Sequence, residues 1–309
     1  MSTMTDTTTT GTPPTSKPPS ETPAKSSNAR RGGGLAPRIV LLVVCVLWTI
    51  PTIGLLVTSV RTRDAASTSG WWTSLAFWDS NWTLSNYDKV IDGNDMGTAF
   101  LNSFIVAIPA TVIPIMFAAF AAYAFTFMRF PGRDVLFIVI VALLVVPIQV
   151  AFVPMIKLLG PDGLDVIGQF LAVWLLHTGF GMPLAIYLLR NYMATLPPSV
   201  IESAEVDGAS HFQTFWRLIV PMSVPALAAF AIFQFLWVWN DLLIALLFLG
   251  AGGENQVVTA NLAQLNGRLG EGWQLLTAGA FITMVVPLIV FFSLQRYFVR
   301  GLTAGSVKG

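Results

Sequence analysis

The sequence predicts an all-α integral membrane protein whose helices form a six-helix transmembrane bundle. Of its 309 residues, 54% are hydrophobic and only 11% are charged, whereas soluble domains average about 25% charged residues. Six stretches are also long and apolar enough to cross a bilayer, which takes about 20 residues at about 1.5 Å per residue. Composition and segment length therefore point to the same fold class.

The six predicted spans account for about half of the sequence from residue 37 onwards. They cover residues 39–60, 99–127, 135–158, 168–189, 226–249 and 276–298. The second and third spans contain Pro109, Pro114, Pro147 and Pro154. Because proline cannot donate a backbone hydrogen bond, these positions predict kinks that neighbouring helices or water would satisfy.

Residues 1–36 differ from the rest of the chain. They consist mainly of Thr, Ser, Pro, Lys and Gly, so they hold too few large apolar side chains to offset the entropy of ordering. We expect a disordered cytoplasmic tail, followed by a six-span domain over residues 37–309. A secretory signal is the alternative, but residues 39–60 exceed the usual apolar length and no small-residue cleavage site follows.

Basic residues indicate the orientation. With a cytoplasmic N-terminus, twelve of the seventeen Lys and Arg residues fall inside, as the positive-inside rule requires. Arg61 and Arg63 argue locally against this topology, because it places them outside. The prediction is a multi-pass protein of the cell membrane with both termini in the cytoplasm. The inside residues are Lys17, Lys25, Arg30, Arg31, Arg38, Arg129, Arg133, Arg190, Arg217, Arg296, Arg300 and Lys308.

Charge and cysteine content exclude several functions. The net charge of +1 gives no electrostatic footprint for nucleic acid. Cys45 is the single cysteine and lies in an apolar run, so neither a disulfide within the chain nor a cysteine metal site is expected. We predict no metal site and no nucleic-acid partner.

The longest predicted cytoplasmic loop, residues 191–224, is not a simple polar connector. It contains LPPSVIESAEVDGASHFQTFWRLIVP. Ser199 with Glu202, and Ser210 with Gln213, have the spacing of a capping box, which predicts the starts of two short helices.

The two helices are expected to meet at Asp207 and Gly208, where glycine can adopt a positive φ without strain. The second helix carries an apolar stripe at spacings of three and four residues. A helix pair of this kind suits docking into a groove on another protein. The stripe consists of Phe212, Phe215, Trp216 and Ile219.

The same segment resembles the EAA loop of permease subunits in binding-protein-dependent ABC importers, written E-A-A, three residues, G, nine residues, I-x-L-P. Ser203 replaces an alanine, Leu218 the isoleucine and Val220 the leucine, and the spacing is intact. The resemblance implies a type I ABC importer permease with a cytoplasmic coupling-helix loop that sits in a cleft of the ATPase subunit. The implied contacts are Glu202, Ser203, Ala204, Asp207, Gly208, Ala209, Phe212 and Pro221.

The resemblance extends over residues 86–309. Over this range the chain is similar to the second membrane subunit of maltose-type sugar importers. It rests on Asn102-Ser103, Ala122-Tyr123, Trp239-Asn240-Asp241 and the tail QRYFVRGLTAGSVKG. It implies a permease that translocates a sugar or oligosaccharide, with a tail that reaches the ATPase dimer. The implied tail contacts are Gly301, Leu302, Thr303, Gly305 and Lys308.

The resemblance also implies partners. No P-loop pattern G-x-x-x-x-G-K-[ST] occurs in the sequence, so this chain is not expected to be an ATPase or any other enzyme. Separate nucleotide-binding subunits would bind ATP and Mg²⁺, and this chain would need no cofactor of its own. Six spans form half of the usual pathway, so we expect a second, related permease and an extracytoplasmic solute-binding protein.

Candidate pathway residues are Trp239, Asn240, Asp241, Asn102 and Tyr123. An aspartate at membrane depth is costly unless it faces a cavity or a partner, and carboxylate, amide and aromatic groups suit sugars. Two interpretations stay open for Asn240 and Asp241. They line the sugar pathway, or they have a structural role in which they bond across helices or break the fifth span.

His177 lies in the fourth span, where packing is favoured over a proton relay. The pattern Gly208-Ala209-Ser210-His211 has a superficial likeness to an intramembrane protease motif, but it lies in a polar loop.

The EAA loop leaves a permease for a non-sugar solute open, because it marks the transporter and not the cargo. An ion-coupled secondary transporter would require repeats and intramembrane carboxylates, of which only Asp241 qualifies. A non-transporting scaffold leaves the two-helix loop unexplained.

Overall fold

The computed structural model describes residues 35–75, 81–93, 95–265 and 272–303, with side chains described as far as residue 295. Within these residues every named element is a helix. The chain divides into two compact units, residues 1–49 and 50–309, and the packing described below lies within the second. Residues 1–34 of the predicted tail fall outside the described residues, and Leu35 and Ala36 belong to the first helix.

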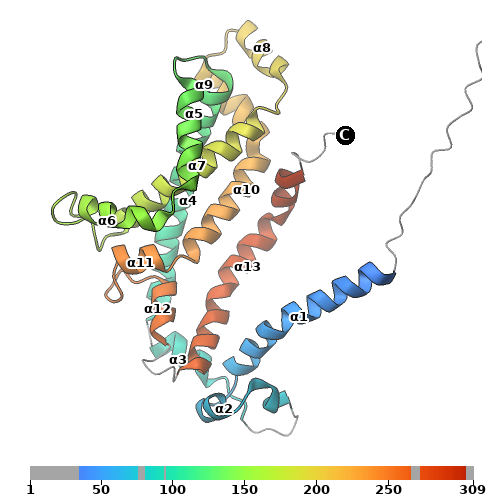
Figure 1. Cartoon of the computed structure of the whole chain (residues 1–309), viewed down its shortest axis with the longest axis vertical. Helices are drawn as coiled ribbons and strands as arrows, with labels where there is room; N and C mark the ends of the chain where they lie inside the picture. The colour runs from blue at the N-terminus through green and yellow to red at the C-terminus, as the bar shows by residue number, and fades with distance from the viewer. Residues whose placement is uncertain (1–34, 76–80, 94, 266–271, 304–309) are drawn as a thin grey trace, which may run out of the picture. The chain divides into compact units, whose positions relative to one another are not determined.

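Figure 1 shows the helices in their order along the chain. A 3₁₀ turn, Leu143–Val145, follows α5, and a π-helical turn, Phe215–Ile219, joins α9 to α10. The helices are α1 (Leu35–Ser59), α2 (Arg63–Thr68), α3 (Ser85–Gly93), α4 (Met96–Phe127), α5 (Arg133–Ala142), α6 (Ile148–Leu159), α7 (Phe170–Met193), α8 (Pro198–Val206), α9 (His211–Thr214), α10 (Val220–Trp239), α11 (Leu243–Phe248), α12 (Val258–Leu265) and α13 (Trp273–Thr303).

Among the residues that the structure describes, five helices are long and apolar enough to cross a membrane, and a sixth candidate span is broken. The broken span comprises residues 133–145 and Ile148–Leu159, which meet at an angle of 101°. Pro147 is the N-cap of α6, and because proline has no N–H the first helix cannot continue through it. The kink predicted at Pro147 is confirmed, and the bend is sharp enough to divide the predicted third span into two helices. α4, in contrast, runs unbroken through Pro109 and Pro114.

The fifth span lies earlier in the chain than predicted. One continuous helical stretch runs from His211 to Asn240 and includes the π-helical turn. It ends before Asp241, and the remaining predicted residues form the separate short helix α11. The prediction of residues 226–249 was wrong at both ends, because the helix starts at the Ser210 cap and breaks at Asn240.

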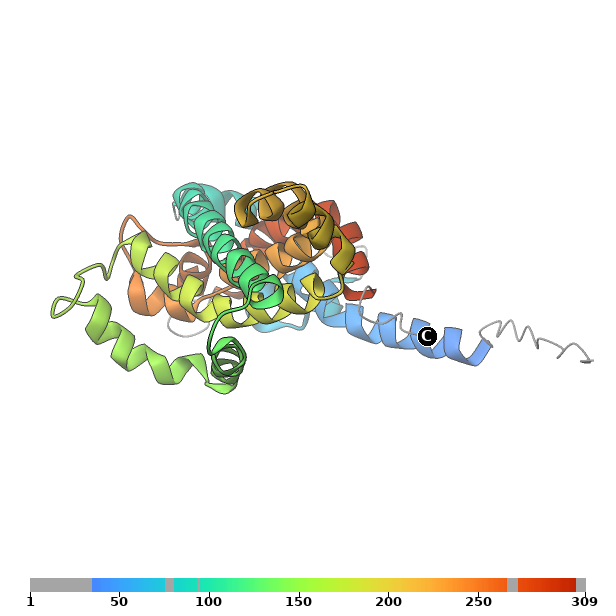
Figure 2. The same cartoon turned by 90° about the horizontal axis from the view of Figure 1, so that it is seen from above.

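α4 is the central helix of the second unit and packs against α7 and α10, while α10 also packs against α13. Its inner face carries small residues, so the neighbouring backbones can approach closely. Seen from above, α6 extends away from the packed helices (Figure 2). The buried small residues of α4 include Ala107, Ala110, Ala118, Ala119 and Ala122.

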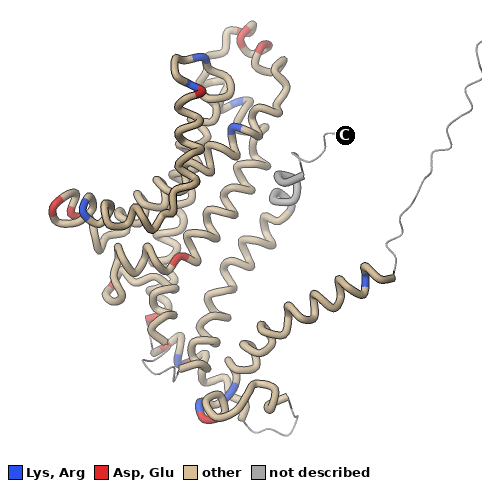
Figure 3. The backbone as a smooth tube through the Cα atoms, viewed as in Figure 1, with Lys and Arg blue, Asp and Glu red and all other residues tan. Residues whose placement is uncertain are grey.

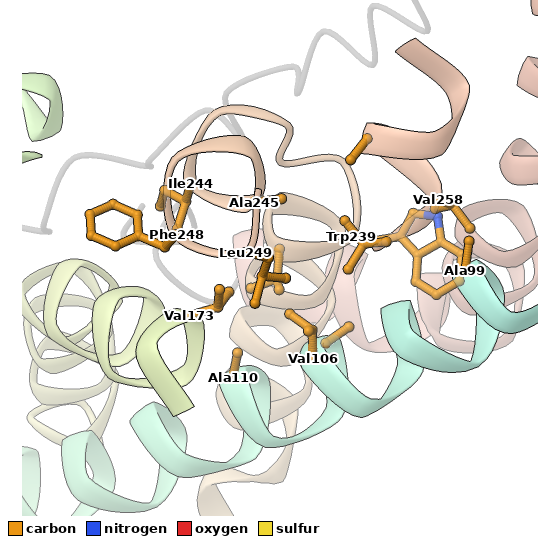
Figure 4. Packing of buried hydrophobic residues seen from close by; sticks show 14 of the residues in the cluster. Ala99, Val106, Ala110, Val173, Trp239, Ile244, Ala245, Phe248, Leu249 and Val258 are labelled. Carbon is orange, nitrogen blue, oxygen red and sulfur yellow. The ribbon is translucent and has the colours of Figure 1, made fainter. Parts of the chain in front are cut away.

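One hydrophobic cluster joins α4, α7, α10, α11 and α12. Figure 4 shows Val106 and Ala110 of α4 facing Trp239 and the residues of α11. A second cluster fills the space between the C-terminal part of α4, α7 and the π-helical turn. The two clusters fix the ends of α10, where the predicted functional segments lie.

Charged residues are almost absent from the long helices and gather at their ends and in the connections (Figure 3). Arg61 also lies in a connection, between α1 and α2, but it is buried and only 1% exposed. Its guanidinium donates hydrogen bonds to the carbonyl oxygens of Ala65, at 2.8 Å, and Ser69, at 3.0 Å. Arg61 therefore has a structural role, which accounts for its position against the charge rule.

Candidate functional site

The α8–α9 segment lies at one end of the bundle, at the end opposite α3 and α12 (Figure 1). The predicted capping box at Ser210 is confirmed. Gln213 N donates to Ser210 Oγ at 3.3 Å, and Ser210 N donates to Gln213 Oε1 at 2.9 Å. These reciprocal bonds satisfy two backbone donors and define where the second helix begins.

The predicted capping box at Ser199 is wrong. α8 begins at Pro198, and Pro197 is the N-cap without any side-chain cap bond. Ser199 thus lies within the first turn, and its carbonyl accepts a bond from the Ser203 hydroxyl at 2.8 Å. Proline competes well for the first helical position because its missing N–H costs nothing there.

Gly208 forms the turn between the two helices with φ of +73°. Its N–H donates to the Glu205 carbonyl at 3.0 Å, and the N–H of Ala209 donates to the Ala204 carbonyl at 2.9 Å. These bonds close the C-terminus of α8 in a left-handed cap. No heavy atom lies within 4 Å of a Cβ built at Gly208, so the glycine is needed for its backbone conformation and not for space.

The predicted coupling residues divide into exposed and buried groups. Glu202, Ser203, Asp207, Phe212 and Pro221 are exposed, whereas Ala204 is buried and Ala209 is half-buried. We call the exposed residues from Glu202 to Phe212, together with Pro221, the coupling face, after their predicted role, whereas Ala204 is 5% exposed.

The predicted apolar stripe is split in the same way. Phe215 and Ile219 are buried within this chain, while Phe212 is 67% exposed and Trp216 remains exposed. The stripe therefore does not face one external groove as predicted. The sequence reasoning missed Val206, which is 87% exposed, although an apolar residue between Glu205 and Asp207 was a usable signal.

The second of the two short helices, α9, is continuous with the fifth span. α9, the π-helical turn and α10 follow one another without a break from His211 to Trp239. π-helical turns are rare and occur frequently at functional sites. No loop separates α9 from α10.

The five candidate pathway residues do not form one site. Tyr123 lies near the α9 end, and its hydroxyl oxygen is 3.0 Å from His211 Nδ1. Asn102 is buried near the other end, where Nδ2 donates to the carbonyls of Glu254 and Gln256 at 2.7 and 2.9 Å. Asn102 therefore fixes the connection between α11 and α12.

Trp239 is 3% exposed and packs in the hydrophobic cluster of Figure 4. Its ring stacks on Phe235 with a centroid distance of 5.6 Å and lies 4.9 Å from the ring of Phe104. Its Nε1 donates to the Thr283 carbonyl at 3.3 Å. This burial leaves no ring face for a sugar in the structure as it stands.

Asp241 caps α11. Its Oδ2 accepts hydrogen bonds from the backbone N–H groups of Ile244 at 3.0 Å and Ala245 at 3.3 Å. Its backbone carbonyl accepts a bond from the Thr259 hydroxyl at 2.7 Å. Asn240 is exposed and donates back to the Leu236 carbonyl at 2.7 Å. These bonds favour the structural interpretation, in which the pair ends the fifth span.

His177 is 1% exposed and its Nδ1 lies 3.0 Å from the Val173 carbonyl, to which it donates. Its Nε2 lies 3.8 Å from Asp241 Oδ2, which is too long for a direct hydrogen bond. The ring also contacts Trp237 edge-on at 5.0 Å. The buried histidine therefore has a packing role, as the sequence favoured, with one acid nearby.

Replacing Asp241 with alanine is expected to lower stability by about 1 kcal/mol, since two side-chain bonds to the first turn of α11 are lost. Asparagine can accept the same backbone bonds, so Asp241→Asn is expected to retain most of the stability and the transport rate. Thermal unfolding in detergent together with vesicle uptake measures both properties. A full loss of transport in Asp241→Asn without a stability change would instead place the carboxylate in the pathway.

The tail positions are described only in part. Gly301, Leu302 and Thr303 belong to the last turn of α13, while Gly305 and Lys308 lie outside the described residues. Among the described residues, no group of three or more His, Cys, Asp or Glu side chains is placed to hold a metal ion.

These features define a multi-pass helical membrane protein with an exposed helix pair joined to one span. Residues 114–304 match the family described by its model as the inner membrane component of binding-protein-dependent transport systems. This chain belongs to that family and is the permease subunit of an ATP-binding cassette importer.

Two relatives cover nearly the whole chain. An osmoprotective compounds uptake permease protein of Synechocystis is 55% identical over 274 residues, with 87% of this chain and 91% of that protein covered. An alpha-glucoside transport system permease protein of Rhizobium meliloti is 43% identical, with 89% of this chain and 97% of that protein covered.

A solved structure of a bacterial ABC transporter involved in alginate import has a similar fold. One of its chains aligns with a TM-score of 0.66 at 22% identity, with 86% of this chain and 98% of that chain covered. This likeness supports the type I importer permease fold that the sequence predicted.

Proposed function

We propose that this chain is one of two related membrane subunits of a sugar importer, and that its coupling face docks on separate ATPase subunits. The observation that carries the proposal is the exposed α8–α9 segment, whose second helix continues into the fifth span without a break. ATP and Mg²⁺ belong to the partner subunits in this account, since the chain has no P-loop pattern.

The proposed mechanism is a transfer of rigid-body motion. Closure of two ATPase subunits pushes on the coupling face, and α10 moves with it because α9 continues into α10. Since α10 packs against α4, α7 and α13, the push rocks the bundle and exposes the pathway alternately to each side. The tail from Gly301 to Lys308 is proposed as a second contact with the ATPase dimer.

The α8–α9 end is proposed to face the cytoplasm, with both chain termini on the same side. Arg129, Arg133, Arg190 and Arg217 support this orientation, because they lie at the ends of the spans on the side of α8 and α9. The positive-inside rule assigns such an end to the cytoplasm. The opposite end, with α3 and α12, then faces the solute-binding protein.

The proposed cargo is a sugar or oligosaccharide delivered by that binding protein. Relatives named for alpha-glucoside and arabinooligosaccharide transport support this cargo class. A second candidate cargo is an osmoprotective compound, because a relative at 55% identity is named for such uptake. The same coupling face would serve either cargo, so transporters for the two cargos would differ in the residues that line the pathway.

Affinity purification of the tagged chain in mild detergent tests the proposal. The expected result is recovery of a P-loop ATPase and a related permease, with ATP hydrolysis stimulated by the cargo-loaded binding protein. Uptake assays with labelled α-glucosides and with labelled osmoprotectants then separate the two cargos. Transport by a lone chain without ATP would contradict the proposal.

A further inference from the structure

Tyr123 joins the central helix α4 to the α8–α9 segment, which together with the π-helical turn we call the coupling segment. Its side chain is 5% exposed, and its hydroxyl oxygen lies 3.0 Å from Nδ1 of His211. His211 is the first residue of α9, directly after the Ser210 cap and three positions after Gly208. A buried hydroxyl thus holds the starting point of α9.

Aromatic packing surrounds this hydrogen bond. The ring of Phe120 stacks on Phe215 at a centroid distance of 4.5 Å, and the ring of Tyr123 meets Phe215 edge-on at 5.5 Å. Phe215 is 3% exposed and opens the π-helical turn. α4 therefore contacts the coupling segment on both sides of the short helix α9.

The position of α4 makes this contact consequential. α4 packs along α7 and α10, so any movement that reaches α4 is distributed to two other spans. The chain connects the coupling segment covalently to α7 through residues 194–197 and to α10 through the π-helical turn. The Tyr123 contact adds a route to α4 that the chain connectivity does not provide.

We propose that Tyr123 and His211 are positioning residues for transport, and that their hydrogen bond transmits movement of the coupling face to α4. The inference rests on the proposed docking of the coupling face on an ATPase, and it adds a second route beside the continuous α9–α10 helix. Tyr123, a candidate pathway residue by sequence, is thereby assigned to coupling.

The bond affects coupling to the extent that its free energy differs between the two states of the transporter. A hydrogen bond between side chains typically contributes about 0.5–1.5 kcal/mol, which corresponds to about a two- to tenfold change in an equilibrium. Loss of the hydroxyl is therefore expected to lower the cargo transported per ATP hydrolysed by about two- to tenfold.

The test uses the complete transporter in lipid vesicles and compares Tyr123→Phe, His211→Ala and the double variant. Tyr123→Phe keeps the ring packing and removes only the hydroxyl. Each single variant is expected to lower the transport-to-ATP ratio, and the double variant to be no worse than either, because both remove one interaction. His211→Asn supplies an amide near the position of Nδ1 and is expected to recover part of the ratio.

Tyr187→Phe on α7 is the matched control, since its ring stacks on Phe137 away from α9 and its ratio is expected to stay unchanged. Thermal stability and subunit yield are recorded for every variant. The inference is overturned by an unchanged ratio, by single effects that multiply in the double variant, or by a ratio that falls only in step with stability. Failure of the unmutated complex to couple ATP hydrolysis to uptake would instead overturn the proposed function.

Discussion

Replacing Gly208 with valine is expected to reduce transport by at least about tenfold. Gly208 has φ of +73°, a conformation that costs other L-residues roughly 1–2 kcal/mol and β-branched residues more. Because no atom occupies the space around a Cβ there, the whole effect acts through the backbone. Relief of the strain would swing α8 away from α9 and separate the two parts of the coupling face.

Two matched variants isolate this effect. Asparagine tolerates positive φ, so Gly208→Asn is expected to retain much of the transport rate. Gly132, with φ of +77°, lies in the turn before α5 and also has no atom around its Cβ position. Gly132→Val therefore imposes a similar strain outside the coupling face, and ATP-driven uptake is the measurement. Equal losses in Gly132→Val and Gly208→Val would show that strain alone, and not the coupling face, is responsible.

Replacing Arg61 with alanine is expected to destabilise the opposite end of the bundle by about 2–4 kcal/mol. Hydrogen bonds from a charged donor contribute about 1.5–3 kcal/mol, and the truncation also leaves a cavity. The guanidinium holds the carbonyls of Ala65 and Ser69 around α2. Nearby, Asn86 Nδ2 donates to the carbonyls of Ser59 and Arg61, at 2.9 and 2.8 Å. Loss of Arg61 therefore loosens the junction of α1, α2 and α3.

Arg61→Lys keeps the charge but not the forked donor geometry, so an intermediate loss is expected. Lys89→Ala removes an exposed basic residue at the same end and is expected to change stability by less than about 0.5 kcal/mol. Thermal unfolding in detergent and limited proteolysis near α2 report the differences. A stability of Arg61→Ala equal to that of Lys89→Ala would contradict the assigned role of the buried guanidinium.

The helical fold and most helix positions follow from hydropathy, because apolar stretches of about 20 residues have few alternatives in a membrane protein. Sequence patterns for helix caps and helix breaks predict less well where two residues compete for the same position. Ser210 caps α9 as predicted, but Pro197 and not Ser199 is the N-cap of α8. Pro147 breaks its span while Pro109 does not, and this difference depends on neighbours that a single sequence does not specify.

The candidate site was predictable in part. The positive φ of Gly208 follows from the residue itself, since the turn between two helices needs a left-handed residue. The burial of Trp239 and the hydrogen bond of Tyr123 were not predictable, because each depends on contacts with distant segments. Trp239 is buried against Phe104 of α4, and Tyr123 pairs with His211 across 88 positions of the chain.

The most direct measurement is a cross-link from the coupling face to the ATPase subunit. Cys45 is the single cysteine, so Cys45→Ser combined with Val206→Cys places one thiol at a position that is 87% exposed. Ile91→Cys, at a position 53% exposed on α3, is the control at the opposite end. We predict an adduct between Val206→Cys and the ATPase and none from Ile91→Cys. Labelling of Val206→Cys by an impermeant thiol reagent outside intact cells, with no ATPase adduct, would contradict the account.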